Sequence, residues 1–291
     1  MNQTNQMNLG RQKLEWSPEV WTRIDQAVHD EAKRTKVAAK FLPLYMAMPG
    51  AFIVPADTTT VVQPLTIDEA AITPLVEILV EFALTPQQYE REPAIMTAVT
   101  LATRATNLLS QAEDLLLFQG NQGLKDDVFK KNQVRHQSGD SGKGLLNVAK
   151  QIIDVPPLTA GVKKWGELTF EKVAEGYAAL QNNGHYGPYA LVLHTIPYAD
   201  TYAPLASTLI MPADRIKPLV TAGFYGTGTL SDLTGVLVSL GGNTMDLVVG
   251  MDTITAFMQE DPQGRYLFRV YERFALRLKD ESAVIRFNFN V

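Results

Sequence analysis

The sequence contains no cysteine among its 291 residues. Disulfide bonds, thiolate metal sites and cysteine nucleophiles are therefore excluded together. No stretch approaches the roughly 18 uninterrupted apolar residues of a membrane-spanning helix. The polar start, MNQTNQMNLGRQKLEW, also lacks the apolar core of a signal peptide. We therefore expect a soluble cytoplasmic protein that has no membrane partner.

Basic residues are outnumbered as well. The chain has 26 Lys and Arg against 31 Asp and Glu, which gives a net charge of −5. This balance argues against a nucleic-acid partner bound through a basic surface. Hydrophobic residues make up 46% and charged residues 20%, as in an ordinary packed protein. The length is at the upper edge of what one core serves, so one elaborate domain or two lobes are expected.

Residues for catalysis are missing too. The chain has four histidines, His29, His136, His185 and His194. None of them stands at metal-ligand spacing from another possible ligand. GFYGTGTLS, at 223–231, lacks the Lys-Ser/Thr ending of a phosphate loop and is interpreted as a turn. No G-x-S-x-G elbow occurs. Adjacent acids such as Glu113-Asp114 splay apart on a helix and are expected to be solvated. We expect no metal and no cofactor.

The N-terminal part predicts one amphipathic helix. Residues 1–15 are polar and are expected to be mobile, or ordered only by a partner. Ser17-Pro18-Glu19 has the residue types of a helix start. Apolar residues then recur at helical spacing, namely Trp21, Ile24, Val28 and Ala32. This face either docks onto the protein's own core or binds a partner.

The middle of the chain predicts an arm, a strand and a long helix. Residues 43–74 are rich in proline and β-branched residues and are interpreted as an extended arm supported by a neighbouring subunit. Residues 76–84 alternate with period two, as in a strand. Residues 93–118 lack internal Gly and are expected to form one helix that stops at Gly120. A polar loop follows, as far as about residue 144.

The C-terminal half predicts a second lobe and a long final strand. Residues 145–249 have a mixed α and β pattern, with 145–153 a short strand or loop. The expected helices are 170–180, 197–206 and 214–221, and the expected strands are 189–194, 235–240 and 245–249. From Tyr266 onward, apolar residues alternate with Arg269, Arg273, Arg277 and Lys279. This alternation predicts a strand with one apolar and one cationic face.

Five segments, in order, resemble encapsulins, which are nanocompartment shell proteins. These segments are WTRID, SQAEDLLLFQGNQGLKD, GPYALVLHTIPYADTY, DLVVGMDTITAFM and FRVYERFALRLKDESAVIRFNF. The resemblance implies an α+β fold, that of the tailed-bacteriophage major capsid protein. It divides the chain into an N-terminal arm and first helix (1–43), an extended arm or E-loop (44–75), a peripheral domain with a spine helix (76–144), an axial domain (145–249) and C-terminal peripheral strands (250–291).

The resemblance also implies a function and two sites. Copies of the chain, on the order of 60 or more, would form a closed icosahedral shell around a cargo enzyme such as a peroxidase or a ferritin-like protein. The cargo's C-terminal peptide would dock at Trp21, Ile24, Val28, Ala32, Asp252 and Ile254. The five-fold pore loop would be Ser207, Thr208, Leu209, Ile210 and Met211, which is uncharged and predicts little charge selectivity.

Two features depart from the resemblance, and other functions remain open. Met48-Pro49-Gly50-Ala51-Phe52 replaces the family's G-P-x-G-W segment, and Gln87 stands where some members have a tryptophan that stacks a flavin. No flavin is therefore predicted. The main alternative is a phage or prophage capsid protein that encloses DNA, which the acidic balance disfavours. A hydrolase or a bacteriocin-like protein is disfavoured by the missing catalytic residues.

Overall fold

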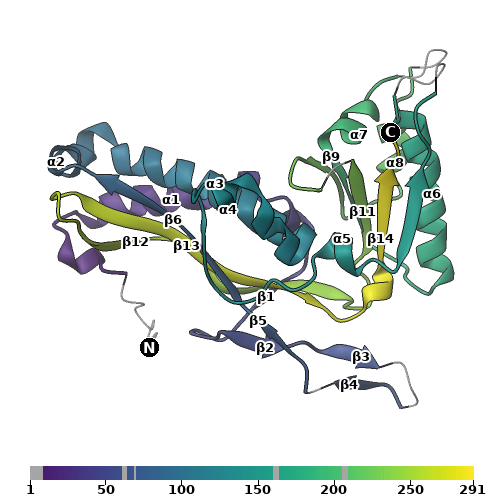
Figure 1. Cartoon of the computed structure of the whole chain (residues 1–291), viewed down its shortest axis with the longest axis horizontal. Coiled ribbons are helices and arrows are strands. Elements are labelled where there is room, and N and C mark those ends of the chain that lie inside the picture. Colours follow the sequence, from purple (N-terminus) through teal and green to yellow (C-terminus); the bar gives the residue numbers. More distant parts are fainter. Residues whose placement is uncertain (1–8, 61–63, 69, 160–163, 205–208, 232) are drawn as a thin grey trace.

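Two five-stranded sheets organise the chain, each at the centre of one lobe, and an arm extends below the region where the lobes join (Figure 1). The computed structural model describes residues 9–60, 64–68, 70–159, 164–204, 209–231 and 233–291. The mixture of helices and sheets agrees with the expected α+β class. The fold matters here mainly because it brings the end of the first helix beside one edge of the first sheet.

The first lobe is a sheet covered on one face by two long helices. Its strand order is β1-β12-β13-β6-β7. The strands are β1 (Leu44–Met46), β12 (Met245–Glu260), β13 (Tyr266–Leu278), β6 (Val76–Leu84) and β7 (Arg135–Ser138). Helices α1 (Pro18–Thr35) and α3 (Thr97–Gln119) lie along the same face (Figure 1). Their apolar sides meet the sheet in a core where Ile24, Leu109 and Phe268 are fully buried.

The helix predicted over 93–118 is in fact the second of two helices. α2 (Pro86–Ile95) starts with a capping box formed by Thr85 and Gln88, and α3 begins only at Thr97. Between them Met96 has a positive φ of 52°, which breaks the helical path. The Glu92 carboxylate accepts N–H bonds from Ala98 and Val99, so it satisfies the free start of α3. The predicted stop at Gly120 is confirmed.

Segments expected to be irregular carry secondary structure. The polar stretch after Gly120 contains η3 (Gly120–Lys125), α4 (Asp127–Lys130) and β7, which joins the first sheet. The turn expected at 223–231 begins as β10 (Gly223–Thr227), paired with β9. In both segments tertiary strand pairing overrides a glycine-rich local sequence.

The second lobe holds the other sheet, in the order β10-β9-β11-β14-β8. The further strands are β9 (Tyr189–His194), β11 (Thr234–Ser239), β14 (Val284–Phe289) and β8 (Gln151–Val155). The helices are α5 (Leu145–Val148), α6 (Gly166–Asn182), α7 (Thr195–Asp200) and α8 (Pro212–Ile216). Leu191, Leu237 and Phe287 fill its core. The strand predicted at 189–194 is confirmed, whereas the helices predicted at 197–206 and 214–221 are shorter and begin earlier.

Two strands belong to a different lobe from the one expected. Residues 245–249, predicted in the second lobe, start the 16-residue strand β12 of the first sheet. Conversely, β14 leaves the C-terminal strands of the first lobe and pairs with β11 and β8 of the second. The chain crosses between the lobes at η4 (Glu281–Ala283), where the Asp280 side chain caps the turn by accepting from Ser282 N–H.

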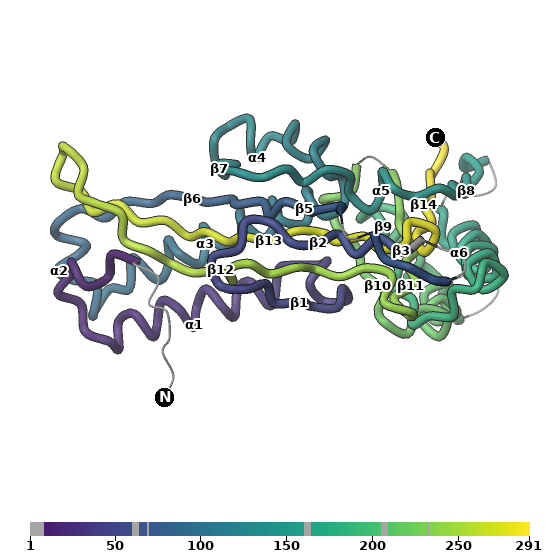
Figure 2. Tube along the Cα trace, turned by 90° about the horizontal axis from the view of Figure 1, so that it is seen from below, coloured from purple at the N-terminus to yellow at the C-terminus, as the bar shows by residue number. Residues whose placement is uncertain are grey.

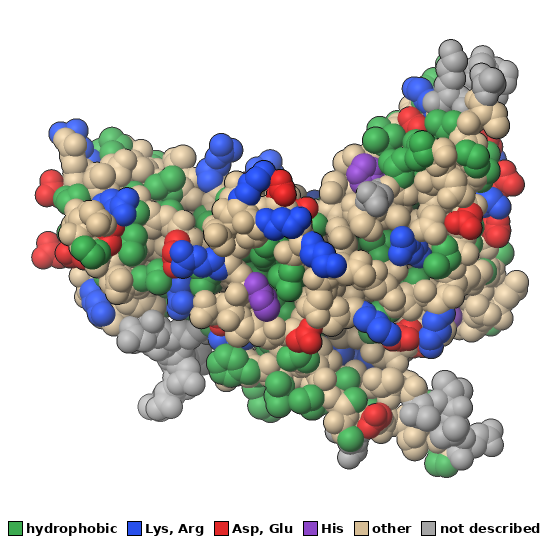
Figure 3. Space-filling model, in the orientation of Figure 1, with side chains coloured by type: hydrophobic (Ala, Val, Ile, Leu, Met, Phe, Trp, Pro, Cys, Tyr) green, Lys and Arg blue, Asp and Glu red, His purple; other side chains and the backbone are tan. Residues whose placement is uncertain are grey.

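The arm consists of two short antiparallel ladders. β2 (Ile53–Pro55) pairs with β5 (Ile72–Pro74), and β3 (Thr58–Thr60) pairs with β4 (Thr66–Asp68). Apolar side chains gather on the lower surface in Figure 3, and the exposed ones of the arm and its base include Met48, Phe52, Ile53, Leu65, Ile67 and Ile72. Burying these side chains requires something outside the protomer.

The arm's base is held by the face of β13 that was expected to be cationic. Arg273 is buried and its guanidinium lies 2.5 Å from the Glu77 carboxylate and 4.0 Å from the ring centre of Phe52. Arg277 is also buried and pairs with Asp246 at 2.8 Å and with Asp57 at 2.6 Å. Both arginines therefore hold the arm's base, Arg273 through Phe52 and the Ala51 carbonyl and Arg277 through its ion pair with Asp57.

Residues 9–15 are ordered against their own lobe, contrary to expectation. Arg11, in η1 (Arg11–Lys13), donates to the Asp25 carboxylate and to the carbonyl of Thr255. The Leu9 carbonyl accepts from Phe257 N–H. The remaining eight residues of the predicted mobile segment lie outside the described residues.

Candidate docking groove

A groove of about 600 Å³ lies between the C-terminal half of α1 and the edge of the first sheet. Its walls are mainly apolar, from Ala32, Ala39, Leu44, Tyr225, Leu247, Val249, Met251 and Phe274. Its charged or titratable lining residues are His29, Lys33, Lys36, Lys40, Glu113, Asp252 and Glu272. An apolar groove with a few polar groups is the usual form of a site for a peptide or small ligand.

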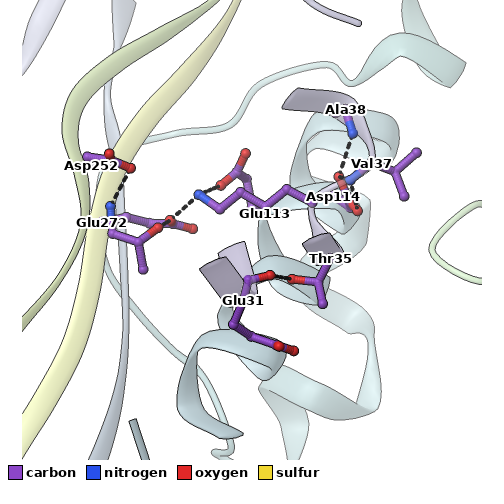
Figure 4. A network of polar contacts seen from close by, with 10 residues as sticks. Glu31, Thr35, Val37, Ala38, Glu113, Asp114, Asp252 and Glu272 are labelled. Carbon is purple, nitrogen blue, oxygen red and sulfur yellow. Dashed lines mark hydrogen bonds and ion pairs between the residues drawn. The ribbon is translucent and has the colours of Figure 1, made fainter. Parts of the chain in front are cut away.

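A buried ion cluster forms the base of this groove (Figure 4). The Lys36 ammonium, at the end of α1, contacts the Glu113 carboxylate of α3 and lies 2.5 Å from the Glu272 carboxylate of β13. The Thr253 hydroxyl donates to the same Glu272 oxygen at 2.6 Å. Both carboxylates have 2% of their side-chain surface exposed. The cluster thus ties the end of α1 to α3 and to the sheet.

Charge in this cluster is unbalanced, with two carboxyl groups around one ammonium. Burial raises the pKa of Glu113 well above its usual range, although Lys36 opposes the shift. Burial disfavours the ammonium of Lys36, but Glu113 and Glu272 together raise its pKa. One oxygen of Glu113 and one of Glu272 have no described hydrogen-bond partner.

Asp114 fixes the chain directly after α1. Its carboxylate accepts N–H bonds from Val37 and Ala38, the latter at 2.9 Å (Figure 4). Burial raises its pKa to about 7, although the two N–H donors favour the ionised form. Glu113 and Asp114 were expected to be solvated, and the structure buries both. Their neighbours come from the segment directly after α1 and from β13, which sequence spacing does not reveal.

The rim of the groove carries exposed charges of both signs. His29, Lys33 and Lys40 are exposed on the side of α1 and the turn after it, and Asp252 is exposed on the side of β12. A bound chain would therefore meet cations on one side and a carboxylate on the other.

Six residues were predicted to bind a cargo peptide, and the structure distributes them over three environments. Ala32 and Asp252 line the groove. Trp21, Ile24 and Val28 are at most 8% exposed and pack in the core beneath α1. Ile254 is half-buried in a separate cluster with Leu79, Ala256 and Tyr271.

Sequence reasoning missed most of the residues that line the groove. Lys36, Glu113 and Glu272 come from three distant segments, and Leu44 was assigned to the start of the arm. The one local signal was helical spacing, because His29, Lys33 and Lys36 recur on the face of α1 that includes Ala32.

The predicted pore loop is only partly described. Ser207 and Thr208 lie outside the described residues. Leu209 is 94% exposed and Ile210 is 55% exposed, and Met211 precedes α8. The described part of the loop is thus apolar and open to its surroundings.

Two kinds of feature are absent from the described residues, a metal site and a membrane-spanning helix. That part of the chain contains no group of three or more His, Asp or Glu side chains that could hold a metal ion. None of its helices has the length and apolar character needed to cross a membrane.

Comparison with known structures identifies the fold. A virus-like particle from Pyrococcus furiosus superposes with a TM-score of 0.65 at 16% identity, covering 93% of this chain and 100% of that one. The capsid of the Myoviridae phage XM1 superposes with a TM-score of 0.59 at 11% identity, covering 88% and 92%. The fold is therefore that of phage-type capsid proteins.

Comparison of sequences identifies the family. Residues 6–275 match the family described as "Encapsulating protein for peroxidase". The type 1 encapsulin shell protein of Myxococcus xanthus is 27% identical, over 95% of this chain and 94% of its own. A diheme-cytochrome-encapsulin shell fusion protein of Kuenenia stuttgartiensis is 24% identical, over 91% and 72%. The chain belongs to the encapsulin family of shell proteins.

Proposed function

We propose that this chain assembles with copies of itself into an icosahedral shell, and that the groove beside α1 holds a segment of the enclosed guest protein. The observation that carries the proposal is that one chain of the encapsulin family has both an exposed apolar arm and a separate apolar groove. The arm would bury its apolar side chains on a neighbour, and the groove would stay open to the guest.

The buried residues of α1 support this assignment indirectly. Trp21, Ile24 and Val28 hold the helix on the lobe, so they position the groove wall. Ala32 and Asp252 would contact the guest directly because they line the cavity. Ile254 lies in a different cluster and would not reach the guest.

The role that we infer is structural instead of catalytic, in a compartment of the cytoplasm. Family membership supports a shell protein. The family's description mentions a peroxidase, and the name of one relative describes a diheme cytochrome fused to an encapsulin shell. We infer a guest enzyme of that redox class. A phage capsid around DNA would share the fold, but the sequence match favours the encapsulin shell. The apolar pore loop that includes Leu209 and Ile210 would admit small solutes with little selection by charge.

Light scattering of the purified chain, expressed without a guest, tests assembly. We expect a uniform particle with a mass tens of times the 32.1 kDa of one chain, because closed symmetry adds many modest contacts. A particle of one or two chains at all concentrations would contradict self-assembly.

A further inference from the structure

The strand that borders the groove has an open edge. β1 ends the first sheet and, among the described strands, pairs with β12 alone (Figure 2). The Pro43 carbonyl and the Ala47 N–H both bond to β12. Because bonding direction alternates along a strand, the N–H and C=O groups of Leu44 and Met46 point away from the sheet. A free set of main-chain donors and acceptors therefore faces outward.

The side chains of β1 are exposed and apolar, although an edge strand normally avoids this. Leu44 is 62% exposed and lines the groove, and Met46 is 67% exposed. With period two, Met46 is on the same side as Leu44. Tyr45 is on the opposite side, with the Arg277 guanidinium 4.2 Å from its ring centre. An exposed apolar edge of this kind is a template for another strand.

We propose that the guest segment docks as an added β-strand along β1, with alternate side chains in the groove. The inference rests on the proposed function and specifies its binding mode. Main-chain bonds to Leu44 and Met46 would supply affinity, and the pockets for every second side chain would supply specificity. The three residues of β1 span ~10 Å at about 3.3 Å per residue. That length fits a short peptide better than a folded partner surface.

The charged residues on the rim of the groove indicate which kind of segment binds there. Lys33 and Lys40 are exposed at the rim, and neither forms an ion pair with a described residue. The Lys40 ammonium donates to the Arg34 carbonyl, and its charge also acts on the buried Asp114 carboxyl without a direct ion pair. The segment that complements the lysine side of the rim, opposite Asp252, is apolar and carries an anionic group there, as the free end of a chain does.

A reporter-loading experiment tests the binding mode. A fluorescent protein with short random C-terminal tags is co-expressed with the full chain, and the tags that co-purify with shells become the probes. Met46→Pro removes the outward N–H, and proline is tolerated at such edge positions. We expect loading per shell to fall about tenfold, because the main-chain bond is lost. Met46→Ala keeps the N–H and should lose at most about threefold, since only side-chain contact is reduced.

A matched control uses β8, one of the two edge strands of the other sheet. Ile152 is 53% exposed on β8. The Val155 carbonyl accepts from Asn290 N–H, next to β14, so the alternation puts the N–H of Ile152 on the open side. Ile152→Pro should leave loading within about twofold of wild type.

Proline scanning of a loaded tag gives a second test that leaves the shell unchanged. Strand addition predicts that proline is tolerated at every second position and excluded between them. A scan without this period, or full loading by Met46→Pro, would overturn the inference. Loss of the shells themselves in Met46→Pro would assign the edge to a second copy of this chain and would also overturn it. If no tag loads into wild-type shells, the proposed function of the groove fails instead.

Discussion

At the scale of single residues, the groove depends on a small balance of buried charge. Lys36 lies between Glu113 and Glu272, from three different elements. Burial of a charge is tolerated only where a partner compensates it. Because burial raises the pKa of Glu113, a proton on that carboxyl keeps the cluster close to neutral. The cluster then holds α1 in place without an excess charge under the groove.

Lys36→Met should be strongly destabilising. The change leaves Glu113 and Glu272 buried without a cation, and breaking such a cluster costs about 3–5 kcal/mol. Urea unfolding measures the free energy of unfolding. The exposed Lys33→Met provides the control and should change it by less than about 0.5 kcal/mol. Equal stability of the two variants would show that the buried cluster contributes nothing.

The buried carboxyl of Asp114 predicts that the stability of the folded protein depends on pH, in a defined direction. Its pKa is 3.8 ordinarily and about 7 in the folded protein, because the carboxyl is buried. The folded state therefore binds the proton more tightly, so the contribution of Asp114 to stability falls as pH rises from about 4 to about 7. Above that range it is constant. The stability difference between wild type and Asp114→Asn, measured by urea unfolding at several pH values, should decline over this window. A flat or rising difference would contradict the assignment.

At the scale of elements, helix ends and glycine-containing turns set the direction in which the chain continues. Gly120 ends α3 with φ 59° and ψ −144°. Residues other than glycine essentially avoid this backbone conformation. A Cβ there would lie 2.3 Å from the Gly142 carbonyl oxygen and 2.5 Å from Gly144 N. The end of α3 and the segment before α5 are thus packed backbone to backbone.

Gly120→Ala should therefore cost more than Gly142→Ala. Both positions have positive φ, but a Cβ at Gly142 meets nothing within 4 Å. We expect Gly142→Ala to lower the free energy of unfolding by about 1 kcal/mol, from backbone strain alone. Gly120→Ala adds a backbone clash and should cost at least about 3 kcal/mol. Thermal unfolding of the two variants compares them, and an equal loss would show that the loop shifts freely to accommodate the methyl group.

Elements with a strong local pattern could be predicted from the sequence, and contacts between distant elements could not. The strands at 76–84 and 189–194 match β6 and β9 exactly in their bounds, because period and apolar runs are local signals. The break at Met96 was missed because the cap comes from the Glu92 side chain. Most of the residues that line the groove were not predicted, because Lys36, Glu113 and Glu272 are far apart in the sequence and meet only after folding.

At the scale of the whole molecule, the protomer exposes apolar surface that only a partner can cover. Ile53 is 54% exposed and Ile72 is 60% exposed on the paired strands β2 and β5. The buried arginines Arg273 and Arg277 fix the base of the arm to the first lobe, because Arg273 donates to the Ala51 carbonyl and Arg277 pairs with Asp57. The arm is therefore presented in a defined direction, which repeated contacts around a closed symmetry require.

Ile53→Asp should block assembly without unfolding the protomer. The new carboxylate would be buried without a partner in the contact between copies, whereas in the isolated arm it remains solvated. Size-exclusion chromatography should show small particles, and circular dichroism should be unchanged. Thr58→Asp adds the same charge at an exposed position of the same arm and should still assemble. Assembly of Ile53→Asp at wild-type levels would exclude this face of the arm from the contact.

The most direct test of the account is cryo-electron microscopy of shells purified together with a loaded guest. The account predicts closed icosahedral particles in which extra density lies in the groove between α1 and β12. That density should run as an extended chain beside β1, next to Leu44 and Met46. Closed shells with guest density elsewhere and an empty groove would contradict the docking site, and the absence of closed shells would contradict the function as a whole.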